Sequence, residues 1–226
     1  MDRLTPCLKI LIYLIIYLSI VNNINQVMAD VENINGKKIN SSPTPPITNI
    51  QPDLLNLLII NQGKGTFIQR KYFKFLNEPI TSEGVFTLHD QKALWQTQSP
   101  IFSQLLLTPK AIFSRIDTDD PYQPLLENSE FSLLLSRLIS GKFDDSTWQE
   151  IVISDSNCVN LKPATITLKK IFSKVQVCLI DKLTRKINLT DSKENNTEII
   201  MSLSSLKIDE EEIVQLNITN LSTVTP

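Results

Sequence analysis

Short segments with alternating apolar and polar positions run from residue 65 to residue 116 and predict closely spaced β-strands. Turns that contain proline separate several of these segments, as at Pro79, Pro100 and Pro109. The connections are too short for crossover helices, so we expect a meander of antiparallel neighbours. The predicted strands are residues 65–71, 84–89, 93–97, 102–107 and 111–116.

The pattern changes to a helical period twice. Residues 52–59 begin with Pro52 and carry a broad leucine-rich surface, which predicts a helix that packs this surface on a sheet. Residues 130–139 predict a second helix, and Gly141 lies where it should end. One helix thus interrupts a long antiparallel sheet. Strand-like segments resume at residues 148–154, 158–161, 175–180, 185–189 and 197–203.

Several central strands have apolar residues on both faces, as in Leu94 with Trp95 and Leu105 with Leu106. A sheet with one solvated face would alternate more regularly, so we expect both faces to be covered. A curved sheet wrapped around its own helices satisfies this pattern, because its concave face holds either a helix or an apolar ligand. A filled core without a cavity also satisfies it, and the pattern alone favours that alternative.

The N-terminal segment predicts export. Arg3 and Lys9 precede an apolar run at residues 10–21, and Ala29 ends a cleavage site with small residues. A membrane-spanning helix needs about 20 residues, and this run is shorter. We therefore expect a signal peptide cleaved after Ala29. The alternative is a retained anchor. We divide the chain into a signal peptide (1–29), a flexible leader (30–50), a folded domain (51–205) and a C-terminal tail of uncertain order (206–226).

The chain has a formal net charge of −2 and contains no block of positive charge. This balance argues against nucleic acid or an anionic membrane surface as the main partner. The acidic run at residues 209–212 is either a docking patch for a basic partner or a solvated face.

Cys158 and Cys178 both follow the predicted cleavage site. The segments around them resemble neighbouring antiparallel strands about a centre near Leu168, and their even spacing places both thiols opposite each other on one face. An exported location permits a disulfide between them. The alternative is two buried, reduced thiols.

The sequence carries no recognisable catalytic constellation. It lacks a Gly-x-Ser-x-Gly elbow and a glycine-rich phosphate loop. His89 and Asp90 are adjacent, so on a strand they would point to opposite faces and form a poor general-base pair. Two cysteines and this lone histidine do not make the ligand spacing of a zinc site. We therefore expect a protein that is not an enzyme and that holds no metal and no cofactor.

Several motifs occur in an order that resembles a known family. They are Gly-Thr-Phe-Ile-Gln-Arg-Lys at residues 65–71, Gly-Val-Phe at 84–86, Leu-Trp at 94–95, Pro100, Asn-Leu-Lys-Pro at 160–163, and the segments 186–191 and 197–200. Together they resemble the opening strands, the Leu-x-Pro strand end and the closing hairpin of the periplasmic outer-membrane lipoprotein carrier family (LolA-like). The likeness covers residues 51–205, and the chain looks like a divergent member.

The resemblance implies an α+β fold: an incomplete, unclosed antiparallel β-barrel, whose strongly curved sheet has helices covering its concave face. It implies a periplasmic carrier that binds the acyl chains of a lipoprotein or related amphiphile in an apolar cavity and moves it from an inner-membrane donor to an outer-membrane acceptor. We expect a monomer.

One departure from the family concerns residues 89–92, where His-Asp-Gln-Lys stands in place of an Arg-Pro pair that the family links to lid control. Lys92 is a flexible point charge and does not reproduce the planar geometry of arginine. This departure argues against loading by the usual ATP-driven donor and favours another amphiphile, such as a glycolipid or an acylated pigment.

Large apolar residues at strand and helix positions are the candidates for the cavity lining, and a structural core role is the alternative for each. They are Phe67, Phe86, Leu88, Leu94, Trp95, Phe102, Leu105, Phe113, Leu134 and Leu138. A shift of one residue in strand facing would exchange the inside set for the outside set. The alternative function for the whole chain is a sensor or adaptor on the same half-barrel, which binds a membrane-protein partner.

Overall fold

The computed structural model describes residues 52–126, 129–143, 148–155 and 157–216. The expected signal peptide and leader at residues 1–50 lie outside this range. The strands are β1 (Gln62–Tyr72), β2 (Ile80–His89), β3 (Lys92–Ser99), β4 (Ser103–Leu107), β5 (Ile112–Arg115), β6 (Gln123–Leu126), β7 (Trp148–Asp155), β8 (Cys158–Pro163), β9 (Phe172–Leu179), β10 (Thr184–Asp191) and β11 (Asn196–Ser205).

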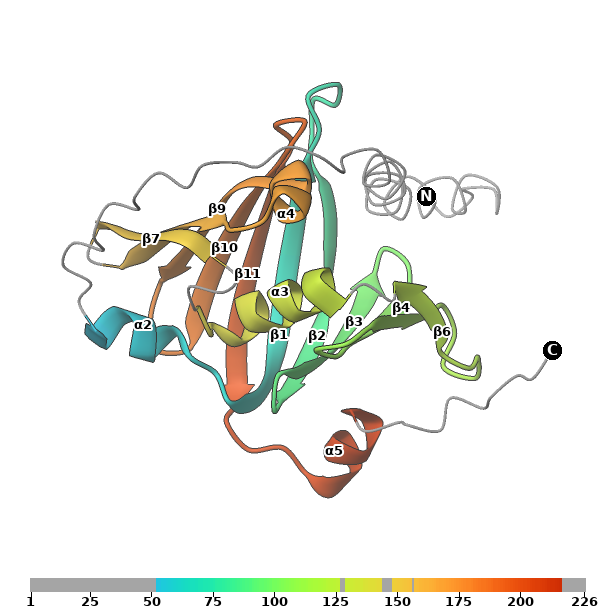
Figure 1. The fold of residues 1–226 in the computed structure, drawn as a ribbon. Coiled ribbons are helices and arrows are strands. Elements are labelled where there is room, and N and C mark those ends of the chain that lie inside the picture. Colours follow the sequence, from blue (N-terminus) through green and yellow to red (C-terminus); the bar gives the residue numbers. More distant parts are fainter. Residues whose placement is uncertain (1–51, 127–128, 144–147, 156, 217–226) are drawn as a thin grey trace, which may run out of the picture.

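All of these strands belong to one antiparallel sheet, in the order β6-β5-β4-β3-β2-β1-β11-β10-β9-β8-β7. Its two halves meet at β1 and β11, which pair Phe67 with Met201. The chain passes from β6 to β7 through α3 (Ser129–Ser140), which runs across one face of the sheet (Figure 1). The sheet ends at β6 and β7 and is unclosed, an arrangement consistent with an incomplete barrel.

The predicted meander is confirmed by the pairing of consecutive strands on each side of β1 and β11. The helix expected at residues 130–139 is α3, and the helix expected at residues 52–59 is α2 (Pro52–Leu58). Among the described helices, none is long and apolar enough to cross a membrane.

Buried apolar residues form two clusters. The larger, which we call the α3 cluster, joins the sheet to α2 and α3 and includes Leu54, Leu58, Phe67, Phe86, Trp95, Leu134, Leu138 and Met201. The smaller, the α5 cluster, consists of Leu94, Leu106, Tyr122 and Leu216, with Phe113 packed against it. Leu94 and Trp95 are consecutive on β3 and therefore point to opposite faces of the sheet. The burial on both faces that the sequence predicts for the central strands is thus present in β3.

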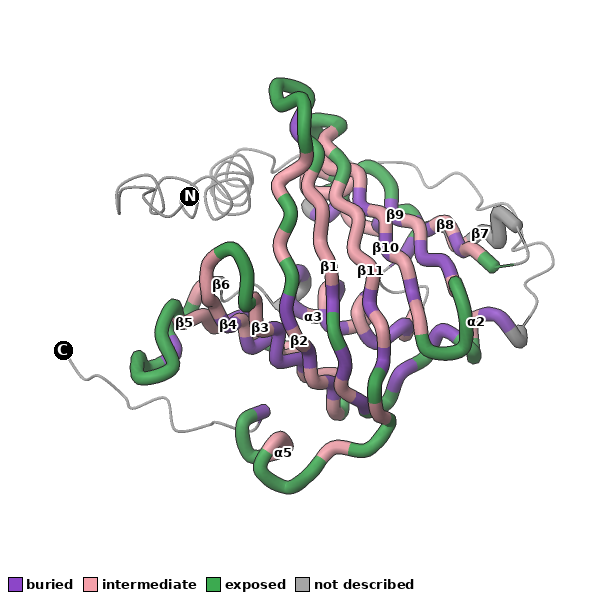
Figure 2. The backbone as a smooth tube through the Cα atoms, turned by 180° about the vertical axis from the view of Figure 1, so that it is seen from behind, coloured by how far each residue is buried: buried purple, intermediate pink, exposed green. Residues whose placement is uncertain are grey.

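Burial also varies along the strands. On β1, buried and less buried positions alternate up to Phe67, and the residues beyond it are half-buried or exposed. Figure 2 shows the same change on the neighbouring β11, whose buried part lies toward its C-terminal end. The two strands therefore extend beyond the packed core toward the β1–β2 and β10–β11 turns.

Gly84 allows β2 and β3 to approach each other at an irregularity in their pairing. A Cβ atom at this position would lie 1.9 Å from the carbonyl oxygen of Gln96, so a larger residue would push the strands apart. Gly84 also lies opposite Phe67 on β1, next to the aromatic part of the α3 cluster.

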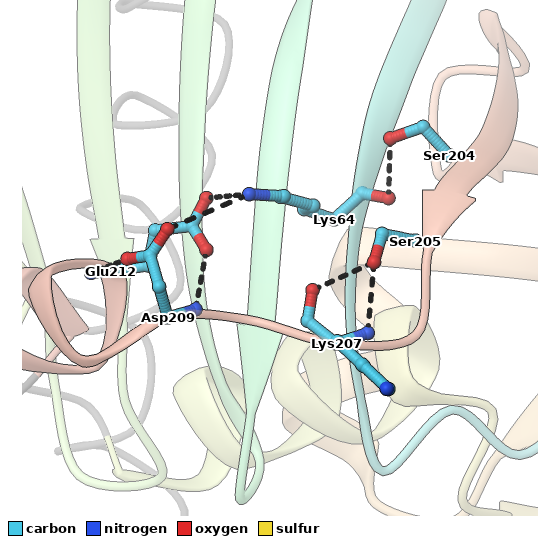
Figure 3. Close-up of polar contacts among 6 residues, drawn as sticks. All are labelled: Lys64, Ser204, Ser205, Lys207, Asp209 and Glu212. Carbon is cyan, nitrogen blue, oxygen red and sulfur yellow. Dashed lines mark hydrogen bonds and ion pairs between the residues drawn. The ribbon is translucent and has the colours of Figure 1, made fainter.

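The segment after β11 turns back onto the sheet and ends in α5 (Glu210–Leu216). A capping box begins this helix: the backbone N–H groups of Glu212 and Asp209 each donate to the other residue's carboxylate over 2.9 Å. Lys64 of β1 adds an ion pair, with its Nζ 2.7 Å from Oε1 of Glu212 (Figure 3). Leu216 is buried in the α5 cluster. Asp209 and Glu212 of the acidic run are therefore engaged within the chain. Residues 206–216 of the expected tail fold onto the sheet, and residues 217–226 lie outside the described residues.

A disulfide joins β8 to β9. Cys158 lies directly opposite Cys178 in the strand pairing, and their sulfur atoms are bonded. The two strands are connected by α4 (Ile166–Ile171), whose N-cap Thr165 accepts a hydrogen bond from the backbone N–H of Leu168. The pairing expected from the even cysteine spacing is the one present, and a short helix that includes Leu168 closes the loop.

Candidate functional site

The α3 cluster is the candidate site, because it brings most of the predicted lining residues together. On the sheet, Phe86 lies opposite Trp95, and the Phe67 ring stacks on Trp95 with centroids 3.9 Å apart. On the helix, Leu134 and Leu138 lie one turn apart and are both fully buried. All five belong to one continuous apolar cluster, so an apolar ligand that entered it would have to displace side chains of α3.

The structure divides the predicted lining residues among three places. Those in the α3 cluster, or packed against it, are Phe67, Phe86, Leu88, Trp95, Leu105, Leu134 and Leu138. Leu94 and Phe113 belong to the α5 cluster instead, because Leu94 and Trp95 alternate on β3 and Phe113 pairs with Leu106. Phe102 precedes β4, is half-buried and belongs to neither cluster. That the first set lines a cavity stays a prediction.

A buried arginine marks one end of this site. The side chain of Arg185 on β10 is 5% exposed. Its Nε donates to the carbonyl of Leu58 over 3.1 Å and its Nη2 to the carbonyl of Leu57 over 2.9 Å. These carbonyls end α2, where the helix dipole favours a cation. Nη1 is buried and has no hydrogen-bond partner among the described residues, and burial lowers the pKa of Arg185 below its usual value.

The ends of α2 and α3 meet beside this arginine. The backbone N–H of Ile60 donates to the carbonyl of Ser140 over 2.8 Å, and Gly141 ends α3 with a φ of +69°. A Cβ atom at Gly141 would lie 1.9 Å from the carbonyl oxygen of Leu58. Glycine is therefore needed for this approach, and Arg185 holds a carbonyl that lies next to both helix ends.

The middle of α3 is attached to the β2–β3 turn. The hydroxyl of Ser136 donates to the carbonyl of Gln91. Asp90 and Gln91 have φ values of 48° and 65°, so they form a tight turn with both central residues in the left-handed region. A hydroxyl group and a backbone carbonyl thus connect the helix to the sheet here.

The same turn corrects the expectation that His89 and Asp90 point away from each other. Because Asp90 has a positive φ, it lies in the turn and not on the strand, and its Oδ2 is 3.3 Å from Nε2 of His89. The Asp90 side chain is largely exposed. Within the described ranges, no three His, Cys, Asp or Glu side chains gather closely enough to hold a metal ion.

Arg185 is the main site residue that sequence reasoning missed. A signal was present, because Arg185, Ile187 and Leu189 occupy alternate positions of one predicted strand and so share one face. A charged residue at the inward position of an otherwise apolar strand needs partners. Nothing in the sequence, however, indicates that these partners are backbone carbonyls more than a hundred residues earlier.

No family model matches the chain, and no curated protein matches it in sequence. Among solved structures, one that is similar is a redesigned β-barrel with 11% sequence identity and a TM-score of 0.28. The match covers 67% of this chain and 96% of the designed barrel. A likeness this distant carries no argument about family or function.

Proposed function

We propose that this protein is an exported, non-enzymatic carrier, which binds the acyl chains of a lipoprotein or related amphiphile between its sheet and helices α2 and α3. In this proposal the sheet is strongly curved, the two helices cover its concave face, and the cargo moves through the periplasm from an inner-membrane donor to an outer-membrane acceptor. The order of sequence motifs that resembles the lipoprotein carrier family also supports this assignment.

One observation carries the proposal: a continuous apolar cluster lies between the sheet and the two helices α2 and α3. Arg185 contacts the end of α2, Ile60 links the ends of α2 and α3, and Ser136 contacts the β2–β3 turn. Helices attached in this way can move as a lid when their apolar contacts are replaced by those of a ligand.

The free energies of such an exchange are of similar size. Burial of a leucine side chain contributes about 1.5–3 kcal/mol, so displacing Leu54, Leu58, Leu134 and Leu138 costs about 6–12 kcal/mol. Each buried methylene of an acyl chain contributes about 0.8 kcal/mol, and about ten of them return about 8 kcal/mol. The exchange is therefore close to balanced, which a carrier needs in order to bind and release its cargo.

Native purification tests the proposal. The protein is isolated from the cell envelope, extracted with organic solvent, and the extract is analysed by mass spectrometry. We expect an acylated species in stoichiometric amount. A protein that repeatedly contains no amphiphile, in cells that express the acylated cargo, would contradict the carrier function.

A second candidate function is a sensor or adaptor that binds a membrane-protein partner and carries no ligand. The stacking of Phe67 on Trp95 and the full burial of Leu134 favour it, because side chains of the protein itself fill this part of the interior. The two functions differ in a simple measurement. A carrier exchanges an apolar ligand stoichiometrically, whereas an adaptor forms a protein complex that survives removal of lipid.

A further inference from the structure

The turn between β1 and β2 exposes a group of apolar side chains. Phe75 is 75% exposed, and Tyr72 and Leu76 are 42% and 41% exposed. Exposing three large apolar side chains within five residues is unfavourable in water unless they contact something else. In both views the β1–β2 turn extends beyond the sheet, in the direction opposite to α5 (Figures 1 and 2). We call residues 72–76 the hairpin tip.

The tip has a defined conformation. The backbone N–H of Leu76 donates to the carbonyl of Phe73 over 3.0 Å and closes the turn. Phe73 is buried, and its ring centroid lies 5.2 Å from that of Phe75. The exposed side chains are therefore presented on a supported turn, which reduces the conformational entropy lost when they bind.

Two of the cations around the tip lie close to a carboxylate. Lys74 forms an ion pair with Glu194, and Nη1 of Arg70 lies 2.9 Å from Oε1 of Glu198. Nζ of Lys71 lies 5.2 Å from the centroid of the Phe73 ring, within the range of a cation–π contact. These ion pairs neutralise Lys74 and Arg70, so we expect the contact of the tip with a partner to depend on apolar burial more than on attraction to an anionic surface.

The size of the tip favours a bilayer over a protein as its partner. A stable protein interface buries about 800 Å² on each side, which three side chains on a narrow turn do not supply. Aromatic residues and leucine that project from a surface fit the interface of a bilayer, where rings lie at headgroup level and lysine side chains reach outward to water. We propose that the hairpin tip inserts Phe75 and Leu76 into the interfacial region of a phospholipid bilayer.

The proposal places the β1–β2 end of the sheet against the membrane and the opposite end in water. Ile180 provides a control at that opposite end. The N-terminal end of β9 lies beside the C-terminal end of β10, where the β10–β11 turn begins, and Ile180 follows the other end of β9. The side chain of Ile180 is 57% exposed. An exposed apolar residue of similar size is therefore available where no insertion is expected.

The test uses tryptophan as a local reporter in the full chain. The two native residues, Trp95 and Trp148, are both buried, so the indole introduced by Phe75→Trp or by the matched control Ile180→Trp reports its own position. Each variant is mixed with phosphatidylcholine vesicles, with and without phosphatidylglycerol, and with lipids that carry bromine in the upper acyl chain. No cargo is added, so the result is independent of the proposed carrier function.

We expect the emission of the Phe75→Trp variant to shift to shorter wavelength and to be quenched by the brominated lipid, with little dependence on phosphatidylglycerol or salt. Adding Leu76→Ser to the Phe75→Trp variant should raise the lipid concentration that gives half of the maximal shift about tenfold. The Ile180→Trp variant should show no shift. Absence of a shift in the Phe75→Trp variant would overturn the proposal. Equal shifts in both reporters, or a shift that requires phosphatidylglycerol and disappears in high salt, would also overturn it.

Discussion

Replacing Arg185 with methionine should loosen α2 while leaving the rest of the fold nearly as stable. The guanidinium of Arg185 holds the carbonyls of Leu57 and Leu58, and methionine fills a similar volume without these donors. Arg185 is also a buried cation, and Nη1 has no partner among the described residues. Replacing Arg185 therefore removes the cost of burying a charge, and it also removes two hydrogen bonds.

The magnitude follows from the surroundings of the two bonds. A hydrogen bond to a charged group contributes about 1.5–3 kcal/mol net. The hydrogen bond to Leu58 is buried, so its full contribution is lost in the variant. The hydrogen bond to Leu57 is only partly buried, and water replaces it. Local opening of α2 should thus become about 1.5–3 kcal/mol easier, which is about 10- to 150-fold in its equilibrium constant. The free energy of global unfolding should change by about 1 kcal/mol or less, because the two effects oppose each other.

Hydrogen–deuterium exchange of backbone amides measures the two quantities separately. The amides to follow are those of residues 56–60, which include the Ile60 N–H that bonds to Ser140. We expect them to exchange about 10- to 150-fold faster in the Arg185→Met variant, while amides of β1 and β11 change little. Urea denaturation gives the global stability.

Arg115→Met is the matched control for this experiment. The guanidinium of Arg115 likewise makes two hydrogen bonds, to the side-chain oxygen of Gln104 and to the carbonyl of Thr118, but it lies on β5 and not on the face toward α2. Its loss should leave the exchange of residues 56–60 unchanged. Unchanged exchange in the Arg185→Met variant, or an equal acceleration in every strand, would show that Arg185 does not hold α2 in place.

Three further predictions concern other parts of the fold. Replacing Cys158 and Cys178 with serine should lower the free energy of unfolding by about 3 kcal/mol, since the bond closes a loop of intermediate length; an unchanged urea midpoint would contradict this. Hydrogen bonds from Lys186 and Arg70 lower the pKa of Glu198 below its ordinary value of 4.5. This stabilisation is present above pH 4.5 and is lost as the pH falls through the lowered pKa. Glu198→Gln should therefore reduce the loss of unfolding free energy at acid pH, measured by urea denaturation at a series of pH values. The same loss in the variant and the wild type would show that the pairing contributes nothing. Leu216→Ala should release α5 from the sheet, seen as faster proteolysis after residue 206, with Val214→Ala, at an exposed position, as the control that should not change it.

The sheet was predictable from the sequence because its signals are local. Turn residues and short connections require consecutive strands to pair, and the even spacing of Cys158 and Cys178 predicts their alignment across two such strands. The short elements were harder. Pro124 weakens the strand signal of β6, and α4 has only six residues.

Helix α5 was missed although its signal is in the sequence. Asp209 and Glu212 have the spacing of a capping box before the apolar residues of this helix. Neither a docking patch nor a solvated face, the two alternatives for the acidic run, includes an N-cap. The ion pair from Lys64 was beyond prediction, because it joins residues that only the return of the chain onto the sheet brings together.

The candidate site was predictable in composition but not in detail. Trp95 and Leu94 are both large and apolar, and only the observed facing of β3 assigns the first to the α3 cluster and the second to the α5 cluster. The role of Arg185 depends on where α2 ends relative to β10, a relation between distant segments that no local pattern contains.

The most direct test of the proposed carrier function is to map where an acyl chain binds. A lipopeptide with a photoreactive group in its acyl chain is incubated with the protein and irradiated, and the attached residues are identified by mass spectrometry. We expect attachment to residues of the α3 cluster, such as Phe67, Trp95 and Leu134, and none to Leu94 or Leu106 of the α5 cluster. Attachment confined to the α5 cluster or to exposed residues, or no saturable attachment at all, would contradict it.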